Sequence, residues 1–191
     1  MHILLTRPLD DSKDLILKFS SLNHKVSHLP LLSIQKKEFI EPDYHDFKGI
    51  IFTSANALKY LDVSKIDKYI ICFCVGAATE RKAKDLGFQN IFCAEGNVNN
   101  LKELILQNFN PKSGPILYVS GEIVSYNLDK DLVAEKYAVK RIINYTATPN
   151  EKLDDNFITE IKSSVPEIVF IYSENSAKAF LNLIKKYNLE K

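Results

Sequence analysis

The feature that most constrains the fold is an alternation of two hydrophobic periods along the chain. Short runs rich in β-branched and aromatic residues alternate with stretches whose apolar residues recur at helical spacing. The apolar runs are Ile3–Thr6, Lys25–Leu29, Gly49–Thr53, Tyr69–Val75, Asn90–Ala94, Ile116–Val119, Val139–Tyr145 and Ile168–Tyr172. Several are apolar at nearly every position, which is typical of parallel strands covered on both faces by helices. The pattern therefore predicts an α/β fold with mostly parallel sheets.

Composition narrows the class of protein. The net charge is +1, so no basic excess favours nucleic acid as a partner. The N-terminus lacks the features of a signal peptide, and no apolar run approaches the ~20 residues that span a bilayer. The three cysteines, Cys72, Cys74 and Cys93, lie inside apolar runs, where we expect reduced core residues. A cytoplasmic protein without membrane or nucleic-acid partners is predicted.

Two parts of the chain repeat. Ser54-x-Asn56, after one apolar run, recurs as Ser173-x-Asn175 after another, and the unit spanning 3–29 recurs at 116–142. We interpret this as two similar domains with exchanged pieces. Ser54 and Ser173 are 119 positions apart, so the counterpart of Gly76 falls at position 195, outside the sequence. The first domain is therefore expected to be short by about two strand–helix units.

Small and hydroxyl residues follow most of the predicted strands. Ligands of open parallel sheets bind beyond the carboxyl ends of the strands, where helix N-termini present free N–H groups. The candidate residues in these turns are Arg7, Thr53, Ser54, Asn56, Gly76, Ala77, Ser120, Gly121, Glu122, Ser173 and Asn175. Such turns suit carboxylate or phosphate groups. The alternative is that their Ser, Thr and Asn side chains only cap the following helices.

Other familiar sites have no support in the sequence. The chain contains no Gly-x-Gly-x-x-Gly and no Walker loop, so a dinucleotide or nucleoside triphosphate site is not predicted. Cys72-x-Cys74 has no Cys or His partner at zinc spacing, and no metal site is expected.

Tyr145 stands where the repeat predicts a crossing between domains. Its phenol could donate a proton in a cleft, or it could simply pack at the junction.

Taken in order, eight short motifs resemble the uroporphyrinogen-III synthase family, and they cover nearly the whole chain. They are Leu5-Thr6-Arg7-Pro8, Pro30-Leu31-Leu32-Ser33-Ile34, Ile51-Phe52-Thr53-Ser54-Ala55-Asn56-Ala57, Val75-Gly76-Ala77-Ala78-Thr79, Ala94-Glu95-Gly96-Asn97, Leu117-Tyr118-Val119-Ser120-Gly121-Glu122, Tyr145-Thr146-Ala147-Thr148-Pro149 and Phe170-Ile171-Tyr172-Ser173-Glu174-Asn175-Ser176. The resemblance implies two flavodoxin-like parallel-sheet domains joined by a two-stranded connector. Domain 1 would comprise 1–33 and 148–191, and domain 2 would comprise 36–144. The connector strands would lie near 32–37 and 143–148.

The resemblance also implies an activity. Members of the family are cyclising hydro-lyases of tetrapyrrole biosynthesis, which convert hydroxymethylbilane into uroporphyrinogen III in the cleft between the domains. Water is lost, ring D is inverted, and no metal or organic cofactor is needed. Tyr145 matches the family tyrosine that assists departure of the hydroxyl group, and Arg7 is a candidate carboxylate contact. A monomer is expected. Two alternatives are a flavodoxin-like ligand-binding protein and a catalytically degenerate tetrapyrrole-binding remnant.

Overall fold

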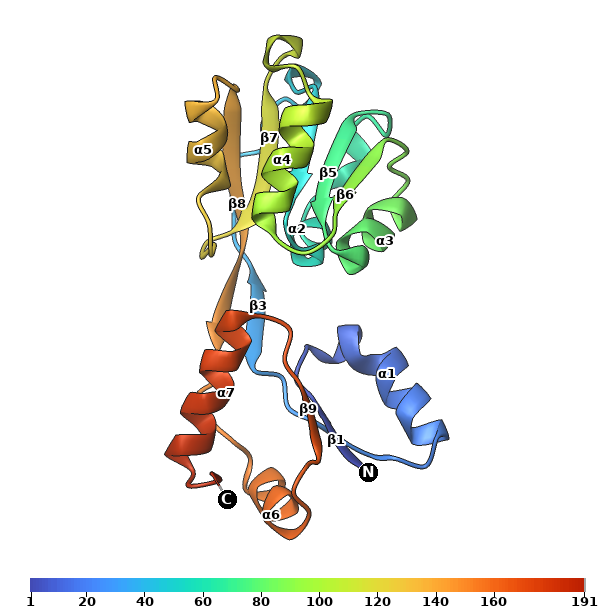
Figure 1. The fold of residues 1–191 in the computed structure, drawn as a ribbon, viewed down its shortest axis with the longest axis vertical. Coiled ribbons are helices and arrows are strands. Elements are labelled where there is room, and N and C mark those ends of the chain that lie inside the picture. The colour runs from blue at the N-terminus through green and yellow to red at the C-terminus, as the bar shows by residue number, and fades with distance from the viewer. Residues whose placement is uncertain (191) are drawn as a thin grey trace. The chain divides into compact units, whose positions relative to one another are not determined.

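The computed structural model describes residues 1–190 and divides into two compact units. Unit 1 comprises residues 1–34 and 147–191, and unit 2 comprises residues 35–146. Two strands, β3 (Leu32–Lys36) and β8 (Val139–Pro149), carry the chain from one unit to the other (Figure 1). Both units are mixed α/β structures with parallel sheets, as the alternating periods predict.

Unit 2 holds the larger sheet. Its strand order is β3-β8-β7-β4-β5-β6, and every pair from β8 to β6 is parallel. The Lys37 amide donates to the Asn144 carbonyl, and the Asn150 amide donates to the Leu31 carbonyl, so β3 runs antiparallel to β8. The elements are β4 (Gly49–Phe52), α2 (Ala55–Lys59), β5 (Ile71–Val75), α3 (Ala77–Asp85), β6 (Ile91–Ala94), α4 (Val98–Asn108), β7 (Ile116–Gly121) and α5 (Leu128–Ala134), with 3₁₀ turns η1 (Tyr44–Asp46), η2 (Val63–Lys65) and η3 (Pro111–Ser113).

Both faces of this sheet are buried. Side chains alternate along a strand, so Ile50 and Phe52 of β4 pack in one cluster and Ile51 packs in the other. Helices α2 and α3 contribute to the first cluster, and helices α4 and α5 contribute to the second. We refer to these as the α2 face and the α4 face of the sheet. This two-sided burial explains why the strands read as almost continuous apolar runs.

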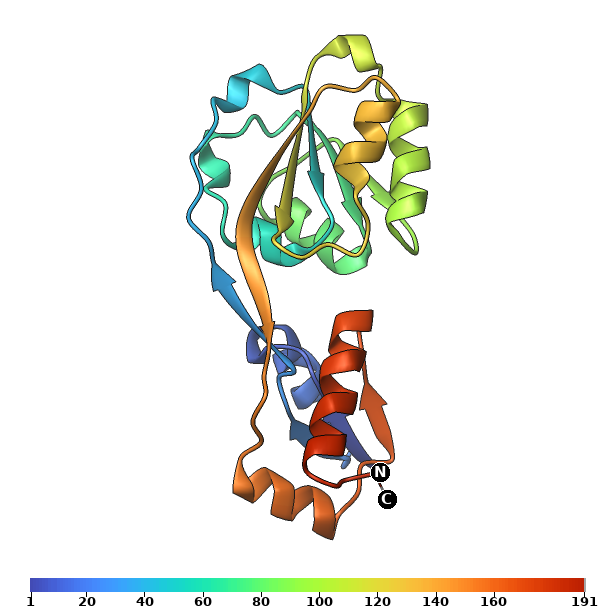
Figure 2. The same cartoon turned by 90° about the vertical axis from the view of Figure 1, so that its left-hand side faces the viewer.

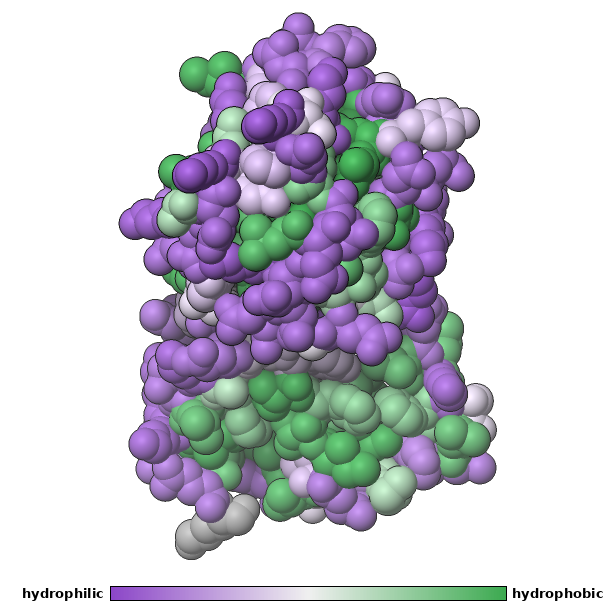
Figure 3. Space-filling view, turned by 45° about the horizontal axis from the view of Figure 1, so that its top comes forward, coloured by the Kyte–Doolittle hydropathy of each residue, from purple (hydrophilic) through white to green (hydrophobic). Residues whose placement is uncertain are grey.

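Unit 1 has a three-stranded parallel sheet of order β2-β1-β9. Its elements are β1 (His2–Leu5), α1 (Leu9–Ser21), β2 (Lys25–His28), α6 (Asp155–Ser163), β9 (Ile168–Phe170) and α7 (Glu174–Lys186). A smaller core around Leu4, Leu31 and Leu183 holds them together. Within the described residues β9 pairs with β1 alone. Apolar side chains are exposed around it, including Val165, Ile168 and Ile171, and green surface is prominent over this unit in Figure 3.

The repeated strand–helix–strand unit is present in both units. Paired residues of β1 and β2 lie 23 positions apart (2 and 25), as do those of β7 and β8 (116 and 139). Gly87 follows the end of α3 with φ +94°, a conformation that favours glycine just after a helix terminus.

Several strand boundaries differ from those predicted by hydrophobic periodicity. β5 begins at Ile71, two residues later than expected, and β9 ends at Phe170, so Tyr172 lies in the following turn. β8 continues to Pro149, four residues beyond the predicted end at Tyr145, because it pairs with β3 over its second half (Figure 2). An exposed strand has few apolar residues, so hydrophobic periodicity does not reveal this extension.

Candidate functional site

The carboxyl end of β7 brings several predicted residues together with Tyr145. The Tyr145 ring lies over Gly121: a Cβ added at Gly121 would be 2.7 Å from Tyr145 Cε2 and Cζ and 2.9 Å from the phenol oxygen. The amide of Glu122 donates to the Tyr145 carbonyl at 3.0 Å. Gly121 is buried and Tyr145 is half-buried. Only a residue without a side chain leaves room for the phenol at this place.

Arg141 holds the β7 terminus from the neighbouring strand. Its Nε donates to Ser120 Oγ at 2.7 Å, and its Nη2 donates to the Gly121 carbonyl at 2.8 Å. The guanidinium also lies 5.7 Å from the centre of the Tyr118 ring. A planar guanidinium can make these contacts at once, whereas a lysine ammonium cannot reproduce the fork. Ser120 therefore serves to hold the turn, since its Oγ accepts from Arg141 and its hydroxyl donates to the Gly121 carbonyl at 3.1 Å.

Glu122 ties the connector strands to the same place. The Lys37 ammonium donates a hydrogen bond to the Glu122 carboxylate. Hydrogen bonds from Lys37 and from the Thr146 hydroxyl, together with the charge of Lys37, lower the pKa of Glu122 below its ordinary value. A carboxylate engaged in this way is an anchor for the strands beside Tyr145.

In the turn after β4, one of the predicted residues, Ser54, caps the following helix, which is the alternative to ligand binding given above. Ser54 Oγ accepts a hydrogen bond from the Asn56 amide at 3.2 Å, so the hydroxyl caps α2. Thr53 Oγ1 lies 3.3 Å from the hydroxyl oxygen of Tyr118. All three predicted residues of this turn are half-buried.

The turn after β5 is open. Gly76 precedes α3 with φ +78°, a conformation that favours glycine, and an added Cβ would meet nothing within 4 Å. The start of α3 has no side-chain capping hydrogen bond, and Ala77 is exposed. Free N–H groups at a helix N-terminus are suited to an anionic group.

Unit 1 carries the remaining predicted residues. The Arg7 guanidinium carbon lies 4.0 Å from the centre of the Tyr172 ring, a cation–π contact. Burial raises the pKa of Tyr172 and the nearby Arg7 charge lowers it, with burial the larger effect. Ser173 caps α7 by accepting from the Ser176 amide at 3.1 Å, and Asn175 is exposed on the first turn of that helix.

Several residues with contacts in unit 2 or beside Arg7 were not singled out from the sequence, among them Lys37, Arg141, Asn144 and Tyr172. Asn144 carried a signal, because it is a polar residue inside the apolar run Ile142–Tyr145. It is fully buried, and its Nδ2 donates to the Ala57 carbonyl at 2.7 Å. Lys37 and Arg141 carried no such signal in the sequence, because lysine and arginine occur throughout the chain.

A cavity of about 230 Å³ in unit 1 involves none of the predicted residues. It is lined by Pro149, Asn150, Glu151, Ala179, Asn182, Leu183 and Lys186. The first three of these residues lie at and just after the end of β8.

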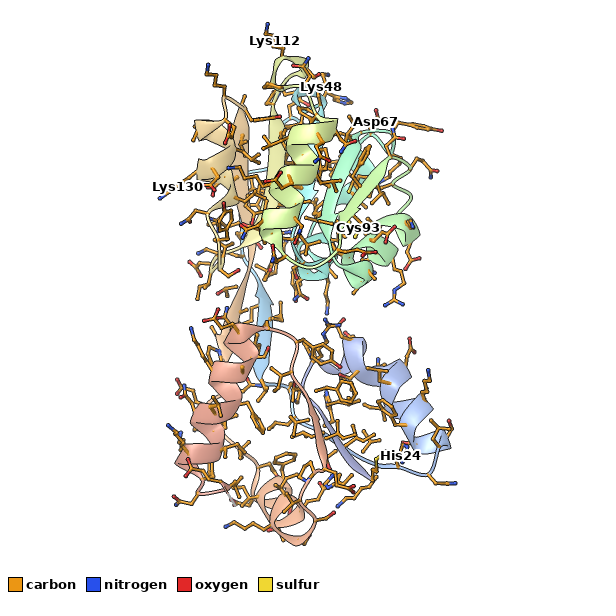
Figure 4. All side chains as sticks on the ribbon, viewed as in Figure 1. His24, Lys48, Asp67, Cys93, Lys112 and Lys130 are labelled. Carbon is orange, nitrogen blue, oxygen red and sulfur yellow. The ribbon has the colours of Figure 1, made fainter. Side chains whose placement is uncertain are left out.

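Over residues 1–190, no group of three or more His, Cys, Asp or Glu side chains is arranged to hold a metal ion. The cysteines are free thiols: Cys72 and Cys74 are buried in β5, and half-buried Cys93 lies on β6 (Figure 4). In the same part of the chain, no helix has the length and apolar character needed to cross a membrane.

Comparison with known proteins gives one family. The family model described as Uroporphyrinogen-III synthase HemD matches residues 13–191. No curated protein sequence matches the chain. The uroporphyrinogen-III synthetase of Helicobacter pylori 26695 superposes with a TM-score of 0.59 at 18% identity, over 95% of this chain and 78% of that one. A mutant uroporphyrinogen III synthase from the extremely thermophilic bacterium Thermus thermophilus superposes with a TM-score of 0.55 at 13% identity, over 97% of this chain and 76% of that one. The structures share the fold, and the family match covers most of the sequence, so the chain belongs to the uroporphyrinogen-III synthase family.

Proposed function

We propose that this protein is a lyase that closes hydroxymethylbilane to uroporphyrinogen III, with inversion of ring D and loss of water. The observation that carries the proposal is the placement of the Tyr145 phenol over Gly121, at the carboxyl end of β7. Carboxyl ends of parallel strands are where ligands of such sheets bind. Family membership supplies the substrate class, a linear tetrapyrrole.

In the proposed first step, the C–O bond of the substrate's hydroxymethyl group breaks. The Tyr145 O–H donates its proton to the departing oxygen, which leaves as water, while the pyrrole nitrogen lone pair forms the azafulvene double bond. The substituted α-carbon of ring D then attacks the azafulvene carbon, which gives a spirocyclic intermediate. The bond between that α-carbon and the methylene bridge to ring C breaks, and the bridge carbon bonds to the free α-carbon of ring D, which loses its proton, so that ring D is inverted. The phenolate regains a proton released when the pyrrole rings recover aromaticity.

The selectivity for isomer III is a matter of conformation, because the azafulvene closes without an enzyme to the symmetric isomer I. The protein must therefore hold the substrate with ring D turned. We assign the start of α3 to binding a substrate carboxylate through the backbone N–H groups of its first residues, Ala77 and Ala78. Gly76 leaves room for the ligand, while its own amide donates to the Ala94 carbonyl at 3.1 Å. Arg7 supplies a guanidinium for another carboxylate, and Thr53, Ser54, Asn56, Ser173 and Asn175 flank the corresponding strand ends.

We also propose that residues 1–33 with 148–191, and residues 36–144, form two flavodoxin-like domains of a cytoplasmic monomer. The division of the chain after residues 34 and 146 supports this assignment. The repeated register of β1 with β2 and of β7 with β8 supports a common origin for the two domains.

The test is a coupled assay. Hydroxymethylbilane is supplied to the purified protein, the products are oxidised, and the isomer I and III porphyrins are separated by chromatography. The proposal predicts isomer III above the level of a no-enzyme control. Isomer I alone, from a protein that is folded by circular dichroism, would contradict it.

A further inference from the structure

Asn144 is the extra residue of a β-bulge. Along β7 and β8 the partners advance together until Ser120 pairs with Ile143, and the next pair is Gly121 with Tyr145. Asn144 therefore has no partner on β7: two residues of β8, Asn144 and Tyr145, stand opposite one residue of β7, Gly121. A bulge of this kind re-aims the side chains that follow it.

The bulge determines which face of the sheet Tyr145 occupies. Ile142 and Tyr145 both pack on the α2 face. Residues three apart in a regular strand point to opposite faces, so without the extra residue Tyr145 would share a face with Arg141 and Ile143. Leu117, Val119 and Gly121 alternate along β7, so a Cβ at Gly121 would point to the α2 face, like the side chains of Leu117 and Val119. The Tyr145 ring occupies that position.

Asn144 is fixed by two hydrogen bonds. Its side-chain Nδ2 donates to the Ala57 carbonyl of the short helix α2 at 2.7 Å, and its backbone carbonyl accepts from the Lys37 amide at 2.9 Å. The side chain is fully buried. Within the described residues its Oδ1 is buried without a hydrogen-bond partner, a destabilising arrangement that an apolar residue of similar size avoids. Retaining an amide here points to a role other than stability.

We propose that Asn144 is a positioning residue, which holds the bulge and thereby directs the Tyr145 phenol toward the α2 face over Gly121. The inference rests on the proposed function, in which that phenol protonates the leaving hydroxyl. Asn144 acts through Tyr145 and does not itself contact the reacting atoms.

One test does not depend on activity. In protein carrying isotope-labelled tyrosine and glycine, NMR cross-relaxation between the Tyr145 ring and the Gly121 α-protons is measured, with Tyr145→Phe and Gly121→Ser used for assignment. Asn144→Ala is expected to abolish these signals, because the bulge loses its bond to Ala57. Should Asn144→Ala not fold, Asn144→Ser replaces it. The serine hydroxyl is too short to reach the Ala57 carbonyl, so the same signals should disappear. Retained signals in either folded variant overturn the proposal.

The second test is a double-mutant cycle on kcat. Asn144→Ala is expected to lower kcat about tenfold or more alone, but less than about twofold in a Tyr145→Phe background, since the two residues act as a unit. An equal factor in both backgrounds contradicts a positioning role. Asn90→Ala is the matched control: its Nδ2 donates to the Tyr69 carbonyl, also at 2.7 Å, and kcat should be unchanged. If Tyr145→Phe alone has no effect, the proposed acid is wrong, and the NMR signals still decide whether Asn144 positions Tyr145.

Discussion

The ring of Tyr145 occupies the space that a side chain at Gly121 would need. A β-carbon there would lie 2.7 Å from two ring carbons and 2.9 Å from the phenol oxygen, closer than van der Waals contact allows. The backbone of Gly121 is held by Arg141 through its carbonyl, so the strand cannot easily yield. The tyrosine must move instead.

Gly121→Ala should therefore lower kcat roughly 10²-fold, the effect of a displacement of about 1 Å in a catalytic group. Isomer III formation and circular dichroism are the measurements. Gly49→Ala is the matched control, because its methyl would lie 2.9 Å from Phe109 Cε2, on the α4 face. That control should lower the unfolding temperature and leave the kcat of folded protein unchanged. Equal kcat values for Gly121→Ala and wild type would remove the steric relationship from the mechanism.

Tyr145→Phe should lower kcat by about 10²-fold or more, in the range expected for loss of a general acid, with the fold intact. Tyr137→Phe offers a comparison, since it removes a phenol hydroxyl that donates to the Phe109 carbonyl at 2.9 Å. It should reduce the free energy of unfolding by about 1 kcal/mol and leave turnover alone. Unchanged turnover in Tyr145→Phe means that another group protonates the leaving hydroxyl.

Stability should depend on the ionisation of Glu122. Its pKa is lowered in the folded protein from an ordinary value of 4.5, first by the Lys37 hydrogen bond, so the stabilisation is present above pH 4.5. It is lost as the pH falls through the lower, folded-state pKa. The difference in unfolding temperature between wild type and Glu122→Gln should therefore shrink as the pH is lowered from about 6 to about 3. A constant difference across that range would show that the Lys37–Glu122 pair does not contribute.

If Arg7 binds a substrate carboxylate as proposed, Arg7→Lys should raise KM several-fold with a smaller change in kcat. A guanidinium can form two parallel hydrogen bonds to a carboxylate while it stacks on Tyr172, and an ammonium cannot. Tyr172→Phe keeps the ring and should leave KM near wild type, whereas Tyr172→Leu should raise it. The measurement is the initial rate against hydroxymethylbilane concentration. A fall in kcat alone would place Arg7 in the chemical step and not in substrate binding.

The cysteines provide a test of the core. Burial raises the pKa of Cys72 to about 12, and burial with the neighbouring thiols raises that of Cys74 further. Because the thiolate is the reactive form, neither should be alkylated by iodoacetamide at about pH 8 in the native protein. Mass spectrometry should show at most one rapid modification, at half-buried Cys93, and three in denaturant. Rapid labelling of Cys72 would indicate an open β5.

The buried part of the fold could be predicted because it follows from local pattern. Ile50, Ile51 and Phe52 are apolar in succession, and only a strand covered on both faces buries all three. β3 has no such pattern, since Gln35 and Lys36 are exposed, and its position came from the family resemblance and not from periodicity. Exposed strands depend on their partners and leave no periodic signal in the sequence.

The candidate site was predictable in part for the same reason. Small residues at strand ends pointed to Gly76 and Gly121, while Tyr145 was singled out by its place at the crossing between domains that the repeat predicts, and the family resemblance supplied its role. The bulge at Asn144 could not be found, because it is a property of two strands in register; the polar residue in the apolar run marks the position but not the skipped pairing. Arg141 and Lys37 act through contacts with residues 20 or more positions away, and no local signal marks them.

The pairing of Ile3 with Ile168 has a consequence for how the chain folds during its synthesis on the ribosome. Residues 35–146 are contiguous and can complete their sheet as soon as they emerge, whereas β1 waits for a partner made 165 residues later. Closing so long a loop is entropically costly and slow. The first strand–helix–strand unit must therefore stay soluble, with only β2 beside β1, while the central unit folds between its two halves.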